Sequence, residues 1–143
     1  MRELSGGFYN LERPVRALMK ETLIGIDKDQ PVQEAAKRMS DLGISSMVAM
    51  DGDEIAGFFT DSDINREVVA RGLGVDTPVR DIMNTELITV DASSTIREAI
   101  EIMTRSQIKH LLVTEKEDII AVLTFGDIFA ADKHMIATYI SRE

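Results

Sequence analysis

The sequence repeats itself at an interval of 64 residues, and this repeat limits the possible folds more than any other feature. Residues 14–64 align with residues 78–128 without a gap, and 15 of the 51 pairs are identical. The segment Pro-Val-Arg at 14–16 recurs at 78–80, and ten of the 36 non-identical pairs are apolar in both copies. Because chance does not produce an ungapped register of this length, the sequence predicts two copies of one structural unit.

Each copy has the pattern of a β-α-β-β-α unit. In the first copy, Val32, Ala35 and Met39 share one face of a predicted helix, for which Gly43 is a natural end. The segment Asp-Gly-Asp-Glu at 51–54 has the composition of a hairpin turn. The predicted elements are strands 23–27 and 87–91, helices starting near 32 and 96, hairpin strands 44–50 with 55–59 and 108–114 with 119–123, and final helices at 62–71 and from 126 toward the chain end.

The predicted fold class is α+β, with two β-α-β-β-α repeats packed through their sheets and related by pseudo-two-fold symmetry. A copy of about 50 residues buries too little apolar surface to be stable alone, so the two copies should share one module. The predicted organisation is an N-terminal segment at 1–13, a first repeat at 14–74, and a second repeat with a C-terminal helix at 75–143.

Composition excludes several classes of protein. The 143 residues are 44% hydrophobic and 29% charged, which is typical of a globular chain. A net charge of -9 argues against nucleic-acid binding, because phosphate backbones are held chiefly by Lys and Arg. The absence of cysteine excludes disulfides, and no apolar run reaches the roughly 18 residues that span a bilayer. We therefore expect a cytoplasmic protein that binds neither nucleic acid nor membrane.

Several segments resemble the CBS domain, named after cystathionine β-synthase, and the pair resembles a Bateman module. The resemblance rests on Pro-Val-Arg-x-x-Met at 14–19, Ile-Lys-His-Leu-Leu-Val at 108–113, Gly-Phe-Phe-Thr-Asp-Ser-Asp-Ile at 57–64 and Ala-Val-Leu-Thr-Phe-Gly-Asp-Ile at 121–128. It extends from residue 14 to about 131. It implies a regulatory module that binds AMP, ADP, ATP (alone or with Mg²⁺) or S-adenosylmethionine between its repeats.

Both copies contain Thr-x-x-Asp where a predicted strand meets a helix, as Thr60 with Asp63 and as Thr124 with Asp127. The resemblance implies that the Asp carboxylate accepts hydrogen bonds from two ribose hydroxyls and that the Thr hydroxyl supports it. A carboxylate suits a vicinal diol because it offers two acceptor oxygens. The same spacing is also typical of helix capping. Both interpretations stay open, and they are compatible.

The resemblance also implies which residues complete each site. The apolar residues of each set given below would enclose adenine, although the same apolar residues are also expected in an ordinary packed core. Thr60 and Asp63 would face Met83, Ile88, Ile108, Lys109 and His110, and Thr124 and Asp127 would face Met19, Ile24, Ile44, Ser45 and Ser46.

The two predicted sites differ in their cations. Lys109, His110 and Arg66, which follows Asp63 by one helical turn, would neutralise a phosphate in the first site. Serines occupy the corresponding positions 45–46 of the second site. We expect a phosphorylated adenosine in the first site and a weak, neutral-ligand-preferring or empty second site. The alternative is that Arg66 only forms a surface ion pair, which is worth little.

No catalytic or metal site is expected. The segment 61–65 begins like an EF-hand loop, but Arg66 stands where that loop needs glycine and Gly72 where it needs glutamate. His110 and His134 are the only histidines, and without cysteine they make no convincing zinc site. We therefore expect no enzyme activity.

The leading hypothesis is a nucleotide sensor that acts through the geometry of the paired repeats on an unidentified target protein. Helical faces at 64–69 and 128–136 would form a homodimer with two-fold symmetry. The rival hypothesis is a ligand-free module that dimerises or tethers. A nucleotide-dependent shift in melting temperature separates the two.

Overall fold

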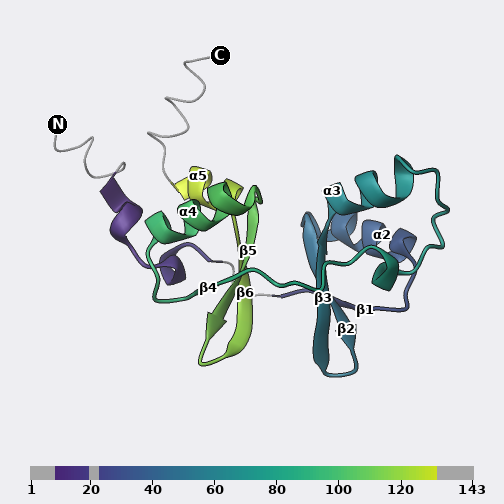
Figure 1. Cartoon of the computed structure of the whole chain (residues 1–143), viewed down its shortest axis with the longest axis horizontal. Helices are drawn as coiled ribbons and strands as arrows, with labels where there is room; N and C mark the ends of the chain where they lie inside the picture. Colours follow the sequence, from purple (N-terminus) through teal and green to yellow (C-terminus); the bar gives the residue numbers. More distant parts are fainter. Residues whose placement is uncertain (1–8, 20–22, 132–143) are drawn as a thin grey trace, which may run out of the picture. The chain divides into compact units, whose positions relative to one another are not determined.

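The computed structural model describes residues 9–19 and 23–131, and contacts divide the chain into two compact units. One unit is the continuous segment Leu23–Leu87, and the other combines the described residues 9–19 and 88–131. Each unit holds a three-stranded sheet with its helices on one side (Figure 1). The expected α+β class with β-α-β-β-α units is confirmed.

In the unit Leu23–Leu87, the sheet has the order β1-β2-β3, with β1 parallel and β3 antiparallel to β2. Alternate strand residues point to one face, so Met47, Ala49 and Phe59 are buried together with Val32 and Met39 of the long helix. The elements are β1 (Gly25–Asp27), α2 (Val32–Leu42), β2 (Ser46–Asp51), β3 (Glu54–Thr60), α3 (Asp61–Ile64), the π-helix η3 (Asn65–Val69) and the 3-10 helix η4 (Val79–Asp81).

The other unit has the same construction. Leu111, Val113 and Leu123 are buried with Ile96 and Met103 of its long helix. This helix begins with a capping box, in which Thr95 and Glu98 have the Thr-x-x-Glu spacing typical of such a cap. Its elements are the 3-10 helices η1 (Tyr9–Glu12) and η2 (Val15–Ala17), β4 (Thr89–Asp91), α4 (Ile96–Ser106), β5 (His110–Glu115), β6 (Asp118–Thr124) and α5 (Phe125–Ala131). The predicted continuation of the last helix lies outside the described residues.

The opening segment of each repeat is hydrogen-bonded to the turn between the first strand and the long helix of the other repeat. Val15 N donates to Ser94 O at 2.7 Å, and Val79 N donates to Gln30 O at 2.8 Å. Both valines are 0% exposed. The compact units therefore do not follow the boundaries of the sequence repeats.

The helix expected over 62–71 differs most from its prediction. Four residues of α-helix are followed by η3, in which Ala70 N donates to Asn65 O at 2.8 Å. This wider turn buries Ile64 and Val68 on the same side, and Gly72 follows with a φ of 74°. Apolar periodicity does not distinguish a π-turn from an α-turn, because one extra residue leaves the buried pattern almost unchanged. The strands begin and end within two residues of their predictions.

The residue that ends the long helix differs between the units. Gly43 ends α2 with a φ of 67°, whereas Gln107 adopts the same left-handed conformation after α4, with a φ of 57°. A Cβ atom makes this conformation costly. We expect Gln107→Gly to raise the free energy of unfolding by about 1 kcal/mol in urea denaturation. Glu101→Gly, on the exposed side of α4, should lower it by roughly 0.5–1 kcal/mol. Equal effects of the two substitutions would contradict this explanation.

Candidate functional site

The strand-to-helix junction after β3 contains a buried carboxylate. Asp63 is 6% exposed. Within residues 9–19 and 23–131, it is the one polar or charged residue that is buried. Thr60 ends β3 and caps α3, so that Asp63 N donates to Thr60 Oγ1 at 3.2 Å and Thr60 N donates to the Asp63 carboxylate at 2.8 Å. The capping interpretation of this Thr-x-x-Asp segment is confirmed.

The two oxygens of the Asp63 carboxylate have unequal surroundings. Oδ2 accepts from Thr60 N at 2.8 Å, from Thr60 Oγ1 at 3.2 Å and from Asn84 Nδ2 at 3.1 Å. Oδ1 accepts from Arg66, whose side chain is 61% exposed. Three donors saturate the lone pairs of Oδ2. Oδ1 therefore keeps the capacity for a further hydrogen bond, and its described partner is an exposed side chain.

Arg66 is held by two carboxylates. Its side chain donates to Glu67 and to Asp63, and these partners raise the pKa of Arg66 above its ordinary value, with the Glu67 hydrogen bond as the largest cause. The guanidinium is thus firmly charged. The ion pair with Asp63, which was the alternative interpretation of Arg66, is present, and it is compatible with a phosphate-binding role.

Asn84 belongs to this site, although the sequence did not reveal it. Its backbone pairs with Phe58 in β3 through N–H···O bonds of 2.8 and 2.9 Å, and its side-chain amide reaches both Phe58 O and Asp63. Comparison of the two repeats gave no signal, because the corresponding position 20 holds lysine. A polar residue before a strand is also ordinary in a connecting segment.

A glycine makes room for this connecting segment. A Cβ atom on Gly57 would lie 2.6 Å from Met83 Sδ and 3.0 Å from Asn84 O. The second repeat has Ala121 at this position, 0% exposed. In the unit Leu23–Leu87, glycine is therefore explained by the close approach of residues 83–84.

The second Thr-x-x-Asp segment is also a helix cap. Thr124 N donates to Asp127 at 3.0 Å, and Asp127 N donates to Thr124 Oγ1 at 2.9 Å. Asp127 is partly exposed, unlike Asp63, and Ala130 occupies the position of Arg66. The two junctions therefore differ in burial and in charge.

The predicted site residues are divided between the two units. Thr60, Asp63 and Arg66 are brought together by hydrogen bonds, and Met83 lies beside Gly57 in the same unit. The unit Leu23–Leu87 also contains Ile24, Ile44, Ser45 and Ser46, whereas Met19, Ile88, Ile108, Lys109, His110, Thr124 and Asp127 belong to the other unit.

Within each unit, the start of the second strand adjoins the Thr-x-x-Asp segment. Ser46 pairs in register with Thr60, and Asp61 N donates to Ser45 O at 3.0 Å. In the other unit, His110 pairs in register with Thr124. The two serines are thus neighbours of Thr60, whereas Lys109 and His110, where β5 begins, are neighbours of Thr124. The combination of Thr60 with Lys109 and His110 joins different units and stays a prediction.

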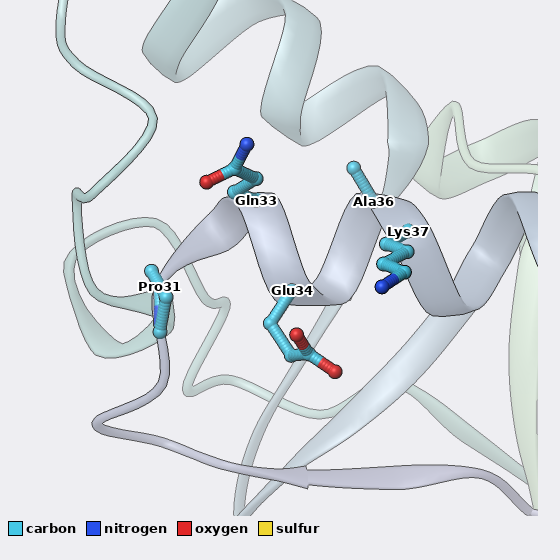
Figure 2. Close-up of a pocket in the computed structure, with 5 residues that line it drawn as sticks. All are labelled: Pro31, Gln33, Glu34, Ala36 and Lys37. Atoms are coloured by element: carbon cyan, nitrogen blue, oxygen red, sulfur yellow. The ribbon is translucent and has the colours of Figure 1, made fainter.

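Two surface depressions of the unit Leu23–Leu87 are lined by residues other than the predicted ones. One, of about 580 Å³, lies along α2 and is lined by Pro31, Gln33, Glu34, Ala36 and Lys37. Figure 2 shows Gln33 and Glu34 on opposite sides of this helix, which makes the feature an open helix surface. Another, of about 530 Å³, lies beside β1 and the β2–β3 hairpin, with Arg38 at its edge.

Residues 9–19 and 23–131 contain no group of three or more His, Asp or Glu side chains arranged to hold a metal ion. None of the helices in these ranges is long and apolar enough to cross a membrane.

Known proteins share this architecture. The CBS domain family matches residues 15–70 and 79–134. The CBS domain-containing protein YhcV of Bacillus subtilis is 25% identical over 114 residues, which cover 80% of this chain and 81% of the relative. Several other curated relatives are longer, and the chain spans about half of their length or less.

Two solved structures match most of the chain. A conserved protein of Pyrococcus horikoshii has a TM-score of 0.81 and 34% identity, with 85% of this chain and 92% of that chain covered. A CBS domain protein of Pyrobaculum aerophilum, complexed with AMP, has a TM-score of 0.71 and 25% identity, with 80% and 88% covered. The chain therefore belongs to the CBS domain family and carries two CBS domains in tandem.

Proposed function

We propose that this chain is a regulatory module that binds an adenosine-type nucleotide and signals through a change in conformation or oligomeric state. The observation that carries the proposal is the buried Asp63 carboxylate, whose Oδ1 faces an exposed arginine. The AMP complex of the Pyrobaculum aerophilum relative supports the same ligand class. The proposed ligands are AMP, ADP, ATP (alone or with Mg²⁺) and S-adenosylmethionine, with a phosphorylated ligand preferred at Asp63.

The chemistry of this junction suits a phosphorylated ribonucleoside. The Arg66 side chain is 61% exposed, so its ion pair with Asp63 contributes little stability and is easily exchanged. A ribose hydroxyl would replace the guanidinium at Oδ1, and Arg66 would then approach a phosphate. In this proposal, Lys109 and His110 add positive charge, while Met83, Ile88 and Ile108 enclose adenine.

The second proposed site contains Thr124 and Asp127, completed by Met19, Ile24, Ile44, Ser45 and Ser46. It has Ala130 where the first has Arg66. We therefore expect weaker binding there, or a preference for a ligand without phosphate.

Isothermal titration calorimetry with AMP, ADP, ATP and S-adenosylmethionine tests the proposal. We expect binding of at least one phosphorylated ligand below millimolar concentration, and at least a tenfold loss in Asp63→Asn, which removes the charge with little change in shape. Asp127→Asn is the matched control and should change this affinity less than threefold. A ligand at 100 times its Kd should also add about 2.7 kcal/mol of stability. Equal affinities for all three proteins, or no binding of any ligand, would disprove the assignment.

Two observations favour a second candidate, a ligand-free interaction module. The Asp63 carboxylate already accepts four hydrogen bonds from its own unit. Val69, Leu73 and Val75 are also exposed after α3, as an association surface would require. Light scattering distinguishes the candidates. This module would form a homodimer without nucleotide, and no adenosyl compound would raise its melting temperature.

A further inference from the structure

We propose that Asn84 is a ligand-positioning residue of the Asp63 site and that its side-chain carbonyl oxygen accepts one hydroxyl of the ribose. The proposal rests on the function proposed above. It assigns a role to a residue in the opening segment of the second repeat.

The orientation of the Asn84 amide follows from its two partners. Its Nδ2 lies 3.0 Å from Phe58 O and 3.1 Å from Asp63 Oδ2. A backbone carbonyl and a carboxylate both act as acceptors, so the nitrogen must face them and the amide cannot be reversed. The Asn84 carbonyl oxygen is consequently directed away from both partners. Because Asn84 is exposed, that oxygen remains accessible.

The backbone fixes the place of this side chain. Asn84 N donates to Phe58 O at 2.8 Å, and Phe58 N donates to Asn84 O at 2.9 Å. Gly57 allows this approach, because a Cβ atom there would lie 3.0 Å from Asn84 O. The asparagine is thus attached to β3 two residues before Thr60. Two backbone bonds and two side-chain bonds hold it, which is the preorganisation expected of a positioning residue.

The saturation of Asp63 Oδ2 creates the need for a second acceptor. A vicinal diol presents two hydroxyl donors, and a carboxylate with both oxygens available can accept them alone. Here Oδ2 already accepts three hydrogen bonds, which leaves Oδ1 for one hydroxyl. Asn84 both occupies Oδ2 and carries an acceptor bonded to the same amide group. The second hydroxyl therefore pairs with the Asn84 carbonyl oxygen.

The test compares ATP with 2′-deoxy-ATP and 3′-deoxy-ATP by calorimetry. We expect the wild-type protein to bind ATP at least tenfold more tightly than either deoxynucleotide. In Asn84→Ala, the affinity ratio of ATP to the deoxynucleotide that lacks the hydroxyl bound by Asn84 should fall to less than threefold. The ratio of ATP to the other deoxynucleotide should stay as in the wild-type protein. Asn84→Asp, whose side chain cannot donate to Phe58 O or to Asp63, should weaken ATP binding at least tenfold. Thr85→Ala, at the exposed next residue, should leave both ratios within twofold of wild type.

Each other outcome has a definite meaning. If Asn84→Ala weakens all three nucleotides by one common factor, the residue has only a structural role and the inference is wrong. Unchanged ratios in Asn84→Ala also overturn the inference, but they leave nucleotide binding intact. If the wild-type protein binds no nucleotide, the proposed function fails and this inference fails with it.

Discussion

Asp63→Ala is expected to lower the free energy of unfolding by about 2–4 kcal/mol in urea denaturation. The substitution removes one half of the α3 capping box, the hydrogen bond from Thr60 N to the Asp63 carboxylate, whereas the backbone N of residue 63 still donates to Thr60 Oγ1. The half-buried N–H and hydroxyl of Thr60 lose their acceptor, at about 1–3 kcal/mol for each group that stays unsatisfied, and the exposed Asn84 amide loses one of its two acceptors. Arg66 adds little to this loss, because its exposed guanidinium is solvated by water.

Asp127→Ala is the matched control at the second junction. Asp127 is partly exposed, so we expect a loss of about 1 kcal/mol, near the usual value for a helix cap. Equal losses in the two variants would contradict the importance of burial and of the Asn84 contact. The comparison also sets the structural background against which any loss of ligand affinity is judged.

Phe59→Ala is expected to lower the free energy of unfolding by about 3–5 kcal/mol, the usual range for a fully buried aromatic residue. Phe59 is 0% exposed in β3 and packs in the core between the sheet and α2. The cavity left behind cannot close fully, because strand pairing with Met47 fixes the backbone on one side. Urea denaturation followed by circular dichroism measures the change.

Val69→Ala is the control in the same unit. This side chain is 68% exposed, so its truncation should change the free energy by less than about 0.5 kcal/mol. A large loss from Val69→Ala would show that this residue is covered in solution and would favour the association surface of the second candidate. A loss below about 1 kcal/mol from Phe59→Ala would contradict its place in the core.

Local sequence patterns predicted much of the fold. The helix from Val32 to the left-handed Gly43 follows from apolar spacing and a glycine, and the capping box at Thr95 follows from four adjacent residues. The two hairpins were equally predictable, because in each a short polar turn separates two apolar runs. The composition of the compact units was not predictable in this way. It depends on hydrogen bonds such as Val79 N to Gln30 O, which join residues far apart in the sequence.

The candidate site was predicted in part. Asp63 follows Thr60 by three residues, and Arg66 follows Asp63 by three, so spacing alone indicated both contacts. Asn84 reaches Asp63 from 21 positions away. Its contact depends on backbone pairing with β3, which no local pattern records. For the same reason, the sequence did not indicate that Gly57 makes room for residues 83–84.

The distribution of the two units along the chain has a consequence for synthesis on the ribosome. The unit Leu23–Leu87 is continuous, so all of its residues are translated before residues 88–131 of the other unit. Val15, which becomes fully buried against residues 92–96, must wait for a segment made several seconds later at roughly 5–20 residues per second. The nascent chain therefore carries the segment around Val15 without its binding partner until residues 92–96 have been translated.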